Sequence, residues 1–349
     1  MNDLISTLVD LIDVPSVVGD EGRLCTTLSE RLMETWGIDG VKRMGNSLIV
    51  GKRSQRPRIL LVGHIDTVPD QGQGPATIEE GRVAGLGASD MKSGLAVMLH
   101  LLEDPAVRLG PYDVVGVFYD REEGPVAENG LEPVFQSAPW LSLAVLAIEL
   151  EPTDLDLQVG CIGTINATVR FEGQSAHSAR PWLGENAITK AGLWLAGVHT
   201  LAPEPIVIDG LEFKEVFSAT TAAGGIARNI IPASFDINLN YRFAPDKSLG
   251  EAEARLEEVA AAADQITIVD RAPAGPVPQD NAHLERLAAE SGAPRMPKQA
   301  WTDVARLAQY GSPAVNYGPG ETAQAHQVAE SVSVDNLPVA FDVLHRFLS

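Results

Sequence analysis

Short apolar runs that end in a histidine or an acidic residue are the feature that most restricts how this chain folds. Residues 58–64 read RILLVGH, so His64 closes an apolar run and Asp66 follows two residues later. The runs DVVGVFYD (113–120) and LAVLAIEL (143–150) also lead into glutamates. Such runs are typical of strands that are buried on both faces of a parallel sheet. Ligands bind at the carboxyl ends of such strands, so the pattern predicts an α/β sheet with a polar site along one edge.

Helical segments complete the first part of the predicted fold. Residues 91–104, MKSGLAVMLHLLED, have helical character, with Asp90 as a candidate N-cap. Leu4, Leu8 and Leu11 share one face of an N-terminal helix. Strands bridged by helices predict a mixed, largely parallel sheet with helices on both faces.

The hydrophobic pattern changes near residue 164. TINATVRFEG (164–173) and SFDINLNYRF (234–243) alternate apolar and polar residues, as antiparallel strands with one solvent-facing side do. Two helical segments, 185–201 and 248–264, accompany these strands, and α/β character returns in the C-terminal part. We therefore predict a discontinuous catalytic domain, 1–163 and 273–349, with an inserted α+β domain at 164–272.

The composition argues against several classes of partner. The chain has 26 basic and 47 acidic residues, a formal net charge of -21, which repels nucleic acids and anionic membranes. No apolar run approaches the roughly 18 residues of a membrane-spanning helix, and the first residues do not resemble a signal peptide. Two cysteines give no disulfide framework and suggest a reducing compartment. We expect a cytoplasmic protein with a small-molecule substrate.

Five predicted strand ends or turns carry imidazole or carboxylate groups. These groups belong to His64 and Asp66, Asp90, Glu122 and Glu123, Glu149 and Glu151, and His326. Carboxylates gathered at one edge repel each other unless a cation lies among them. Histidine with carboxylates, and without cysteine, suits zinc or a similar metal. A shared carboxylate allows two metals about 3.5–4 Å apart, and a further glutamate can take a proton from the attacking water.

Five segments, in this order, resemble the metal-site motifs of the M20 family of dinuclear zinc amidohydrolases and peptidases. They are GHIDTVP (63–69), GASDMKSG (87–94), YDREEG (119–124), LEPTD (150–154) and AHQVAE (325–330). The resemblance covers nearly the whole chain and implies two zinc ions, for which Co²⁺ could substitute. The implied ligands are His64, Asp90 as the bridge, Glu123, Glu151 and His326. The resemblance also implies that Glu122 is the general base and that Asp66 orients His64, while Glu149 remains an alternative to Glu151.

The inserted domain resembles the dimerisation domain of the same family, which implies a homodimer. His177, in GQSAHSARP, matches a histidine that the partner subunit contributes in this family to polarise the scissile carbonyl. Asn229 and Arg242 match substrate-binding residues, and Arg180 and Gly320 are further candidates. Arg242 also fits a plain solvent-facing position on its strand, so both interpretations stay open.

Within the family, the chain most resembles short actinobacterial enzymes that hydrolyse N-succinyl-L,L-2,6-diaminopimelate. The segments that carry this resemblance are AHSARPWLG (176–184), NIIP (229–232), NYRFAPD (240–246), WTDVARL (301–307) and PAVNYGPG (313–320). This similarity implies a metal-dependent hydrolase of linear amides that releases succinate and L,L-diaminopimelate for lysine and cell-wall synthesis. Acetylornithine deacetylases, aminoacylases and dipeptidases share the machinery and are the alternatives. A non-catalytic binding module is the alternative from another class, but all five ligand positions and Glu122 are filled here.

Overall fold

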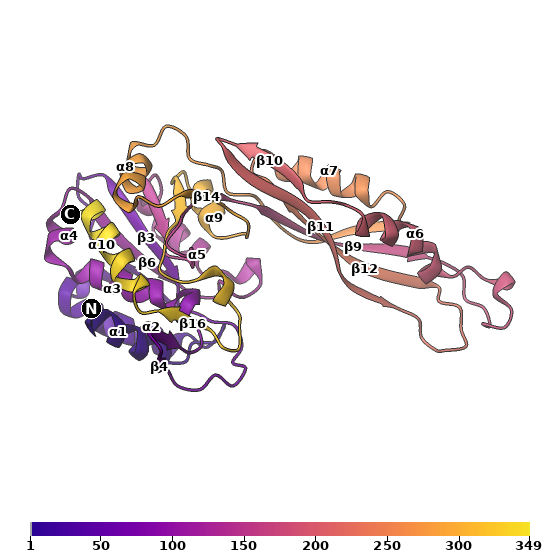
Figure 1. Ribbon diagram of the computed structural model, residues 1–349, viewed down its shortest axis with the longest axis horizontal. Helices are drawn as coiled ribbons and strands as arrows, with labels where there is room; N and C mark the ends of the chain where they lie inside the picture. Colours follow the sequence, from indigo (N-terminus) through magenta and orange to yellow (C-terminus); the bar gives the residue numbers. More distant parts are fainter. Residues whose placement is uncertain (1) are drawn as a thin grey trace. The chain divides into compact units, whose positions relative to one another are not determined.

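The computed structural model describes residues 2–349, which form two compact units (Figure 1). The first unit contains the chain up to Val159, then Pro278–Met296 and Arg306–Ser349. The second contains Gly160–Val277 and Pro297–Ala305. Residues 160–163, 273–277 and 297–305, which were expected in the catalytic domain, lie in the second unit. None of the helices within residues 2–349 is long and apolar enough to span a membrane.

A mixed eight-stranded sheet, which lies mostly in the first unit, confirms the predicted α/β fold class. Its order is β1-β2-β6-β3-β7-β15-β8-β14. The bounds are β1 Val41–Met44, β2 Ser47–Val50, β3 Arg58–His64, β6 Asp113–Tyr119, β7 Leu146–Glu149, β8 Leu157–Cys161, β14 Arg295–Lys298 and β15 Ala314–Asn316. The central strand β3 pairs in parallel with β6 and β7, and β15 pairs in parallel with β7. Because β3, β6 and β7 run the same way, the chain leaves all three at one edge of the sheet.

Helices pack around this sheet, and α3 is the most deeply buried of them. The helices are α1 Asn2–Ile12, α2 Gly22–Trp36, α3 Ser93–Glu103, α4 Pro105–Leu109, α5 Leu131–Ser137, α8 Ala282–Ser291, α9 Val304–Gln309 and α10 Asn336–Leu348. A small sheet of β4 Thr77–Glu79, β5 Arg82–Ala84 and β16 Ser331–Ser333 was not predicted. The predicted N-cap at Asp90 is wrong, because α3 begins at Ser93 and its N-cap position is occupied by Lys92.

The second unit is built on a five-stranded antiparallel sheet of order β10-β11-β12-β9-β13. Its elements are β9 Gly163–Glu172, α6 Ala187–His199, β10 Glu204–Ile208, β11 Leu211–Gly224, β12 Ser234–Phe243, α7 Leu249–Val259 and β13 Gln265–Ala272. The alternating residues of β12 bury one face, where Ile237 and Leu239 pack with Val169 and Trp194. Strands β10 and β11 were missed, because the second half of β11, SATTAAG, is exposed and lacks an apolar alternation.

Lys92 ties the end of α1 to the segment that precedes α3. Only 2% of this lysine is exposed, and its Nζ donates hydrogen bonds of 3.0 Å to the carbonyl oxygens of Leu11 and Val14. Burial lowers the pKa of Lys92 from 10.5 to about 7. A neutral amine still supplies two donors, so both carbonyls keep their partner when the proton is lost.

We expect Lys92 to make the protein more stable as the pH rises. Its folded pKa lies below its unfolded value, so between pH 7 and 10.5 the unfolded chain binds more protons. Unfolding free energy then rises by up to about 1.4 kcal/mol per pH unit in that window. Urea unfolding at several pH values should show this rise, and Lys92→Met should remove it. The exposed-site control Lys42→Met should retain it, and an unchanged slope in Lys92→Met would assign the effect to another group.

Candidate metal centre

Histidine and carboxylate side chains meet where β3, β6 and β7 end. His64 is the last residue of β3, Glu122 and Glu123 follow β6, and Glu151 follows β7. Asp90 comes from the turn before α3, and His326 from the loop between β15 and β16. The possible ligand atoms lie within 4.8 Å of one another in three groups, which are His64–Asp90–Glu151, Asp90–Glu123–His326 and His64–Glu122–Glu123. Residues from five separate segments of the chain therefore converge on one small volume.

Asp90 lies between two of these groups. Its Oδ1 is 3.1 Å from His64 Nε2, and its Oδ2 is 3.7 Å from His326 Nε2. On the outer sides, Glu151 Oε1 is 3.7 Å from His64 Nε2, and Glu123 Oε1 is 3.0 Å from His326 Nε2. Each oxygen of one carboxylate therefore faces a different imidazole. This is the arrangement that a carboxylate needs in order to be shared between two cations.

The electrostatics of the two imidazoles show how strongly this site favours positive charge. Burial lowers the pKa of His64, but the nearby carboxylates of Asp66 and Asp90 outweigh it and raise this pKa well above its ordinary value. The hydrogen bond with Glu123 raises the pKa of His326 to about 9, against the effect of burial. Divalent cations compete with protons for such groups. The nitrogen and oxygen donors, without thiolates, fit zinc or a similar first-row metal.

Asp66 contacts both sides of the centre. Its carbonyl oxygen lies 3.0 Å from His64 Nδ1, whereas its nearest carboxylate oxygen lies 3.6 Å from that nitrogen. The carboxylate instead accepts hydrogen bonds from the backbone N–H groups of Glu122, at 3.0 Å, and Glu123, at 2.9 Å. Asp66 therefore fixes the histidine ring mainly through its backbone, and the paired glutamates through its side chain. From the sequence, only the contact of Asp66 with His64 was expected.

Glu149 and Glu151 occupy different environments. Glu149 ends β7 and is fully buried, and its Oε1 accepts a 3.0 Å hydrogen bond from the hydroxyl of Tyr119. Glu151 lies beyond the strand end, in a group with His64 and Asp90. Of the two alternatives, only Glu151 stands among the possible ligand groups of the described residues.

Glu330 is a residue of this site to which the sequence analysis gave no role. It is 2% exposed, and its carboxylate accepts hydrogen bonds from the backbone N–H groups of Gly87 (2.8 Å), Ser89 (2.8 Å) and Asp90 (2.9 Å). These three bonds fix the turn that carries Asp90. The feature of the sequence that could have pointed to Glu330 is its position four residues after His326, within the segment AHQVAE.

Glu330→Gln is expected to weaken metal binding about 10- to 100-fold, because supporting residues of metal ligands typically have effects of this size. The amide has one acceptor oxygen, so it cannot keep all three N–H groups bonded, and Asp90 loses its fixed position. Calorimetric titration with Zn²⁺ would measure the change. Glu290→Gln, on α8, serves as the charge-matched control, and equal affinity in Glu330→Gln and wild type would show that the turn does not depend on Glu330.

Gly320 joins two of the ligand-bearing loops. A Cβ at this position would lie 2.2 Å from the carbonyl oxygen of Ser89 and 2.8 Å from Cβ of Pro152, so only glycine fits without displacement. Its carbonyl oxygen accepts hydrogen bonds from the N–H groups of Thr153 (3.0 Å) and Asp154 (2.9 Å). The loop of Glu151 and the turn of Asp90 are thereby packed together, whereas the expected substrate contact of Gly320 stays a prediction.

Three of the predicted substrate-contacting residues gather at one end of the second unit. His177 forms a β-bridge with Ile230, and its carbonyl oxygen accepts a 2.8 Å hydrogen bond from the N–H of Arg180. The carbonyl of Asn229 accepts a 2.9 Å bond from the N–H of Ser178. His177, Arg180 and Asn229 are all exposed.

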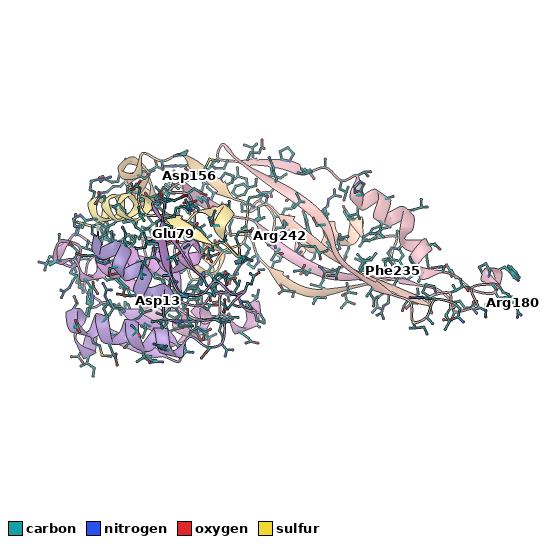
Figure 2. The ribbon with its side chains drawn as sticks, turned by 60° about the horizontal axis from the view of Figure 1, so that its bottom comes forward. Asp13, Glu79, Asp156, Arg180, Phe235 and Arg242 are labelled. Carbon is teal, nitrogen blue, oxygen red and sulfur yellow. The ribbon has the colours of Figure 1, made fainter. Side chains whose placement is uncertain are left out.

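Arg242 lies at the opposite end of this unit from Arg180, as Figure 2 shows. It is near the end of β12, opposite Thr164 of β9, whereas Asn229 precedes the start of β12. Eight residue steps from Ser234 to Arg242 correspond to about 26 Å of strand. Arg242 is half-buried, its Nε donates a 3.1 Å hydrogen bond to Asn240 Oδ1, and burial lowers its pKa. A single chain therefore does not bring Arg242 together with His177, Arg180 and Asn229.

The fold and the cluster of histidine and carboxylate side chains are typical of metal-dependent hydrolases. Comparison with known proteins identifies the family. Residues 60–349 match the model of peptidase family M20/M25/M40, so the chain belongs to this family of hydrolases acting on amide bonds. It is 32% identical to the succinyl-diaminopimelate desuccinylase of Corynebacterium glutamicum, over 100% of this chain and 97% of that protein. It is 40% identical to a Mycobacterium tuberculosis protein named "Putative succinyl-diaminopimelate desuccinylase DapE", over 99% of this chain and 98% of that one.

Solved structures of the family share the fold. A tripeptidase from Staphylococcus aureus superposes with a TM-score of 0.81 at 20% identity, covering 99% of this chain and 97% of that one. The Bacillus subtilis YXEP protein, described as a dinuclear metal binding peptidase of the M20 family, superposes with a TM-score of 0.67 at 16% identity, covering 99% and 97%. The shared fold extends over both units of the chain.

Proposed function

We propose that this protein hydrolyses the succinyl amide bond of N-succinyl-L,L-2,6-diaminopimelate and releases succinate and L,L-diaminopimelate. The observation that carries the hydrolytic part is the carboxylate of Asp90, whose two oxygens face His64 and His326. The succinyl substrate is supported by the full-length similarity to the Corynebacterium glutamicum desuccinylase.

We assign two Zn²⁺ ions, replaceable by Co²⁺, to the two groups that share Asp90. His64 and Glu151 would complete the first group, and Glu123 and His326 the second. Cations bound here would polarise the amide carbonyl and lower the pKa of a bound water. The raised pKa values of both histidines support the assignment. They show that the carboxylates of the site favour positive charge, which a bound proton supplies when no metal cation is present.

Glu122 is the proposed general base. It lies in a group with His64 and Glu123, and Asp66 fixes its backbone N–H. Its carboxylate takes one proton from the attacking water, whose oxygen bonds to the amide carbon. The same proton is then delivered to the amide nitrogen as the carbon–nitrogen bond breaks. The acyl part departs as a carboxylic acid, whose proton passes to the amine, so the final products are a carboxylate and an ammonium ion, and one glutamate both accepts and returns the transferred proton.

We propose that the protein is a homodimer through the second unit and that His177 acts on the substrate bound by the other subunit. This proposal is supported by the positions of His177 and Arg242, which lie at opposite ends of the sheet of this unit, so that two copies could supply both residues to one substrate. His177 would polarise the scissile carbonyl, while Arg242, Asn229, Arg180 and the backbone of Gly320 would bind its polar ends.

Mixing two inactive variants tests this arrangement. A mixed dimer contains one His177→Ala chain and one Glu122→Gln chain. The site of the His177→Ala chain then has its own intact Glu122 and receives the intact His177 of the other chain, whereas the second site lacks both residues. Random exchange should restore about a quarter of wild-type activity, because half of the dimers are mixed and each has one intact site. Sedimentation would verify dimers, and a mixture as inactive as its components would contradict the action of His177 in trans.

Kinetics with paired substrates test the acyl specificity. N-succinyl- and N-acetyl-diaminopimelate share the same amine, so their difference isolates the distal carboxylate. We expect kcat/KM to favour the succinyl compound by about 100-fold or more, because the acetyl compound leaves the cationic residues proposed to bind the distal carboxylate without their anion. Faster turnover of N-acetylornithine or of dipeptides would reject the succinyl assignment while retaining the amidase chemistry.

We also propose a reducing compartment, the cytoplasm, as the site of action. Cys25 and Cys161 are both buried, and neither forms a disulfide bond within the described residues. Burial raises the pKa of Cys25 to about 11, so this thiol stays protonated and unreactive at neutral pH. Such cysteines are typical of proteins that do not depend on disulfides.

A further inference from the structure

A basic segment of the chain has no part in the mechanism above. Residues 51–58, GKRSQRPR, contain Lys52, Arg53, Arg56 and Arg58 and no acidic residue, in a chain whose net charge is -21. A cluster of positive charge in a strongly acidic protein indicates a local electrostatic role for this segment.

The fold places part of this segment beside a cavity of about 360 Å³ in the first unit. The residues around it are Trp36, Lys52, Arg56, Pro105, Arg108 and Leu109, with Asp113 and Val114 at its base. The volume is within the range of small-molecule sites, and the combination of aromatic, apolar and charged walls is also typical of them.

The residues that line the cavity carry more positive than negative charge. Asp113 is buried and accepts hydrogen bonds from Arg56 Nε (3.0 Å) and from the N–H (2.6 Å) and Oγ (2.7 Å) of Ser54. Arg56 also donates a 2.6 Å bond to the carbonyl oxygen of Gly110. Arg56 and Asp113 therefore neutralise each other. Lys52 and Arg108 remain, so three cations less one carboxylate give a local charge of +2.

Trp36 and Arg108 form the flat wall of the cavity. The guanidinium carbon of Arg108 lies 5.0 Å from the centroid of the indole ring, and Trp36 Nε1 donates a 3.0 Å hydrogen bond to the carbonyl oxygen of Leu102. The ring is thus fixed in place. Nε of Arg108 is buried and has no hydrogen-bond partner within residues 2–349. Because this buried atom does not face the cavity, an anion would bind the other guanidinium nitrogens of Arg108, which the contact with the indole ring holds in place.

The cavity is separate from the candidate metal centre. It lies near Arg58 and Asp113, where β3 and β6 begin, whereas His64 and the segment after Tyr119 lie where those strands end. Six residue steps along a strand correspond to about 20 Å. A ligand of ordinary size in the cavity therefore does not reach the ligands of the metal centre.

We propose that this cavity is a second binding site, for a small organic anion with an apolar or aromatic body. The anionic group would lie between Lys52 and Arg108, and the body would pack against Trp36 and Pro105. The strongly acidic remainder of the chain opposes anion binding at long range. Binding therefore depends on the local charge of +2 within a Debye length, about 8 Å at physiological salt, and weakens as salt is added.

Phenyl phosphate and inorganic phosphate are suitable probes, used with the full-length, zinc-loaded protein. The indole N–H resonance of Trp36, assigned with Trp36→Phe, reports on this cavity and is remote from the metal centre. We expect a saturable shift with phenyl phosphate, about tenfold tighter than with inorganic phosphate because only the former has a body to bury. Raising the salt from about 20 to 200 mM should weaken binding severalfold.

Two variants and one control make the result decisive. Lys52→Gln, at an exposed position, and Arg108→Gln should each weaken phenyl phosphate binding about tenfold, and Arg255→Gln, on α7, should leave it unchanged. The exposed lysine variant keeps the test valid if Arg108→Gln destabilises the fold. No shift of the Trp36 resonance, or equal affinity in Lys52→Gln and wild type, would overturn the proposal. Equal affinity for the two probes would also overturn it, since the apolar body is part of the proposed ligand.

Discussion

Glu122→Gln should lower kcat for amide hydrolysis by about 10²- to 10⁴-fold, the usual contribution of a positioned general base. Glutamine has nearly the shape of glutamate but cannot accept the proton of the attacking water or return it to the amide nitrogen. Metal content should stay at the wild-type level, because neither of the two groups that share Asp90 includes Glu122. Steady-state kinetics together with elemental analysis of the purified variant would measure both quantities.

Glu79→Gln is the matched control for this substitution, since Glu79 lies on the exposed strand β4. It should leave both kcat and metal content unchanged. A Glu122→Gln protein that keeps more than about a tenth of wild-type kcat would reject the general-base role. Loss of metal in the same variant would instead make Glu122 a ligand, as its place in the group with His64 and Glu123 would then suggest.

Asp90→Asn should remove most of the metal from both proposed sites at once. The carboxylate faces His64 through one oxygen and His326 through the other, whereas an asparagine offers one neutral oxygen and an N–H₂ group that repels a cation. We expect the affinity for Zn²⁺ to fall at least about 100-fold and activity to fall with it. Native mass spectrometry would count the ions that each chain retains.

The behaviour of single-site variants makes this prediction specific. His326→Ala and Glu151→Ala should each weaken one ion more than the other, because each residue belongs to one of the two groups. Asp342→Asn, an exposed substitution on α10, should retain both ions. If Asp90→Asn lost only one ion while the second bound normally, Asp90 would not be shared.

The sequence predicted much of this centre because strand ends determine where side chains meet. The chain leaves β3, β6 and β7 at one edge of a parallel sheet, so His64, Glu123 and Glu151 were expected together from their positions alone. Asp90 and His326, from a turn and a loop, were expected in the same cluster, and the family resemblance added which of the clustered residues would be metal ligands. The structure shows that these five residues do converge.

What the sequence did not reveal depends on backbone hydrogen bonds and on strand register. Glu330 was overlooked because its partners are three consecutive or nearly consecutive N–H groups, which leave no pattern in side-chain identity. The helix start near Asp90 was wrongly predicted because an aspartate before a helix usually caps it. Here the residue belongs to the cluster with His64 and His326 instead. The separation of Arg242 from Asn229 followed only from the register of β12 with β9.

The most direct test of the central claim is to add Zn²⁺ stepwise to metal-free protein while measuring succinate release from N-succinyl-L,L-2,6-diaminopimelate. We expect no turnover without metal, an increase as ions bind, and full activity at two equivalents per chain. It also predicts equal amounts of succinate and L,L-diaminopimelate. Full turnover by the metal-free protein would contradict the metal centre, and no succinate release with two ions bound would contradict the proposed substrate.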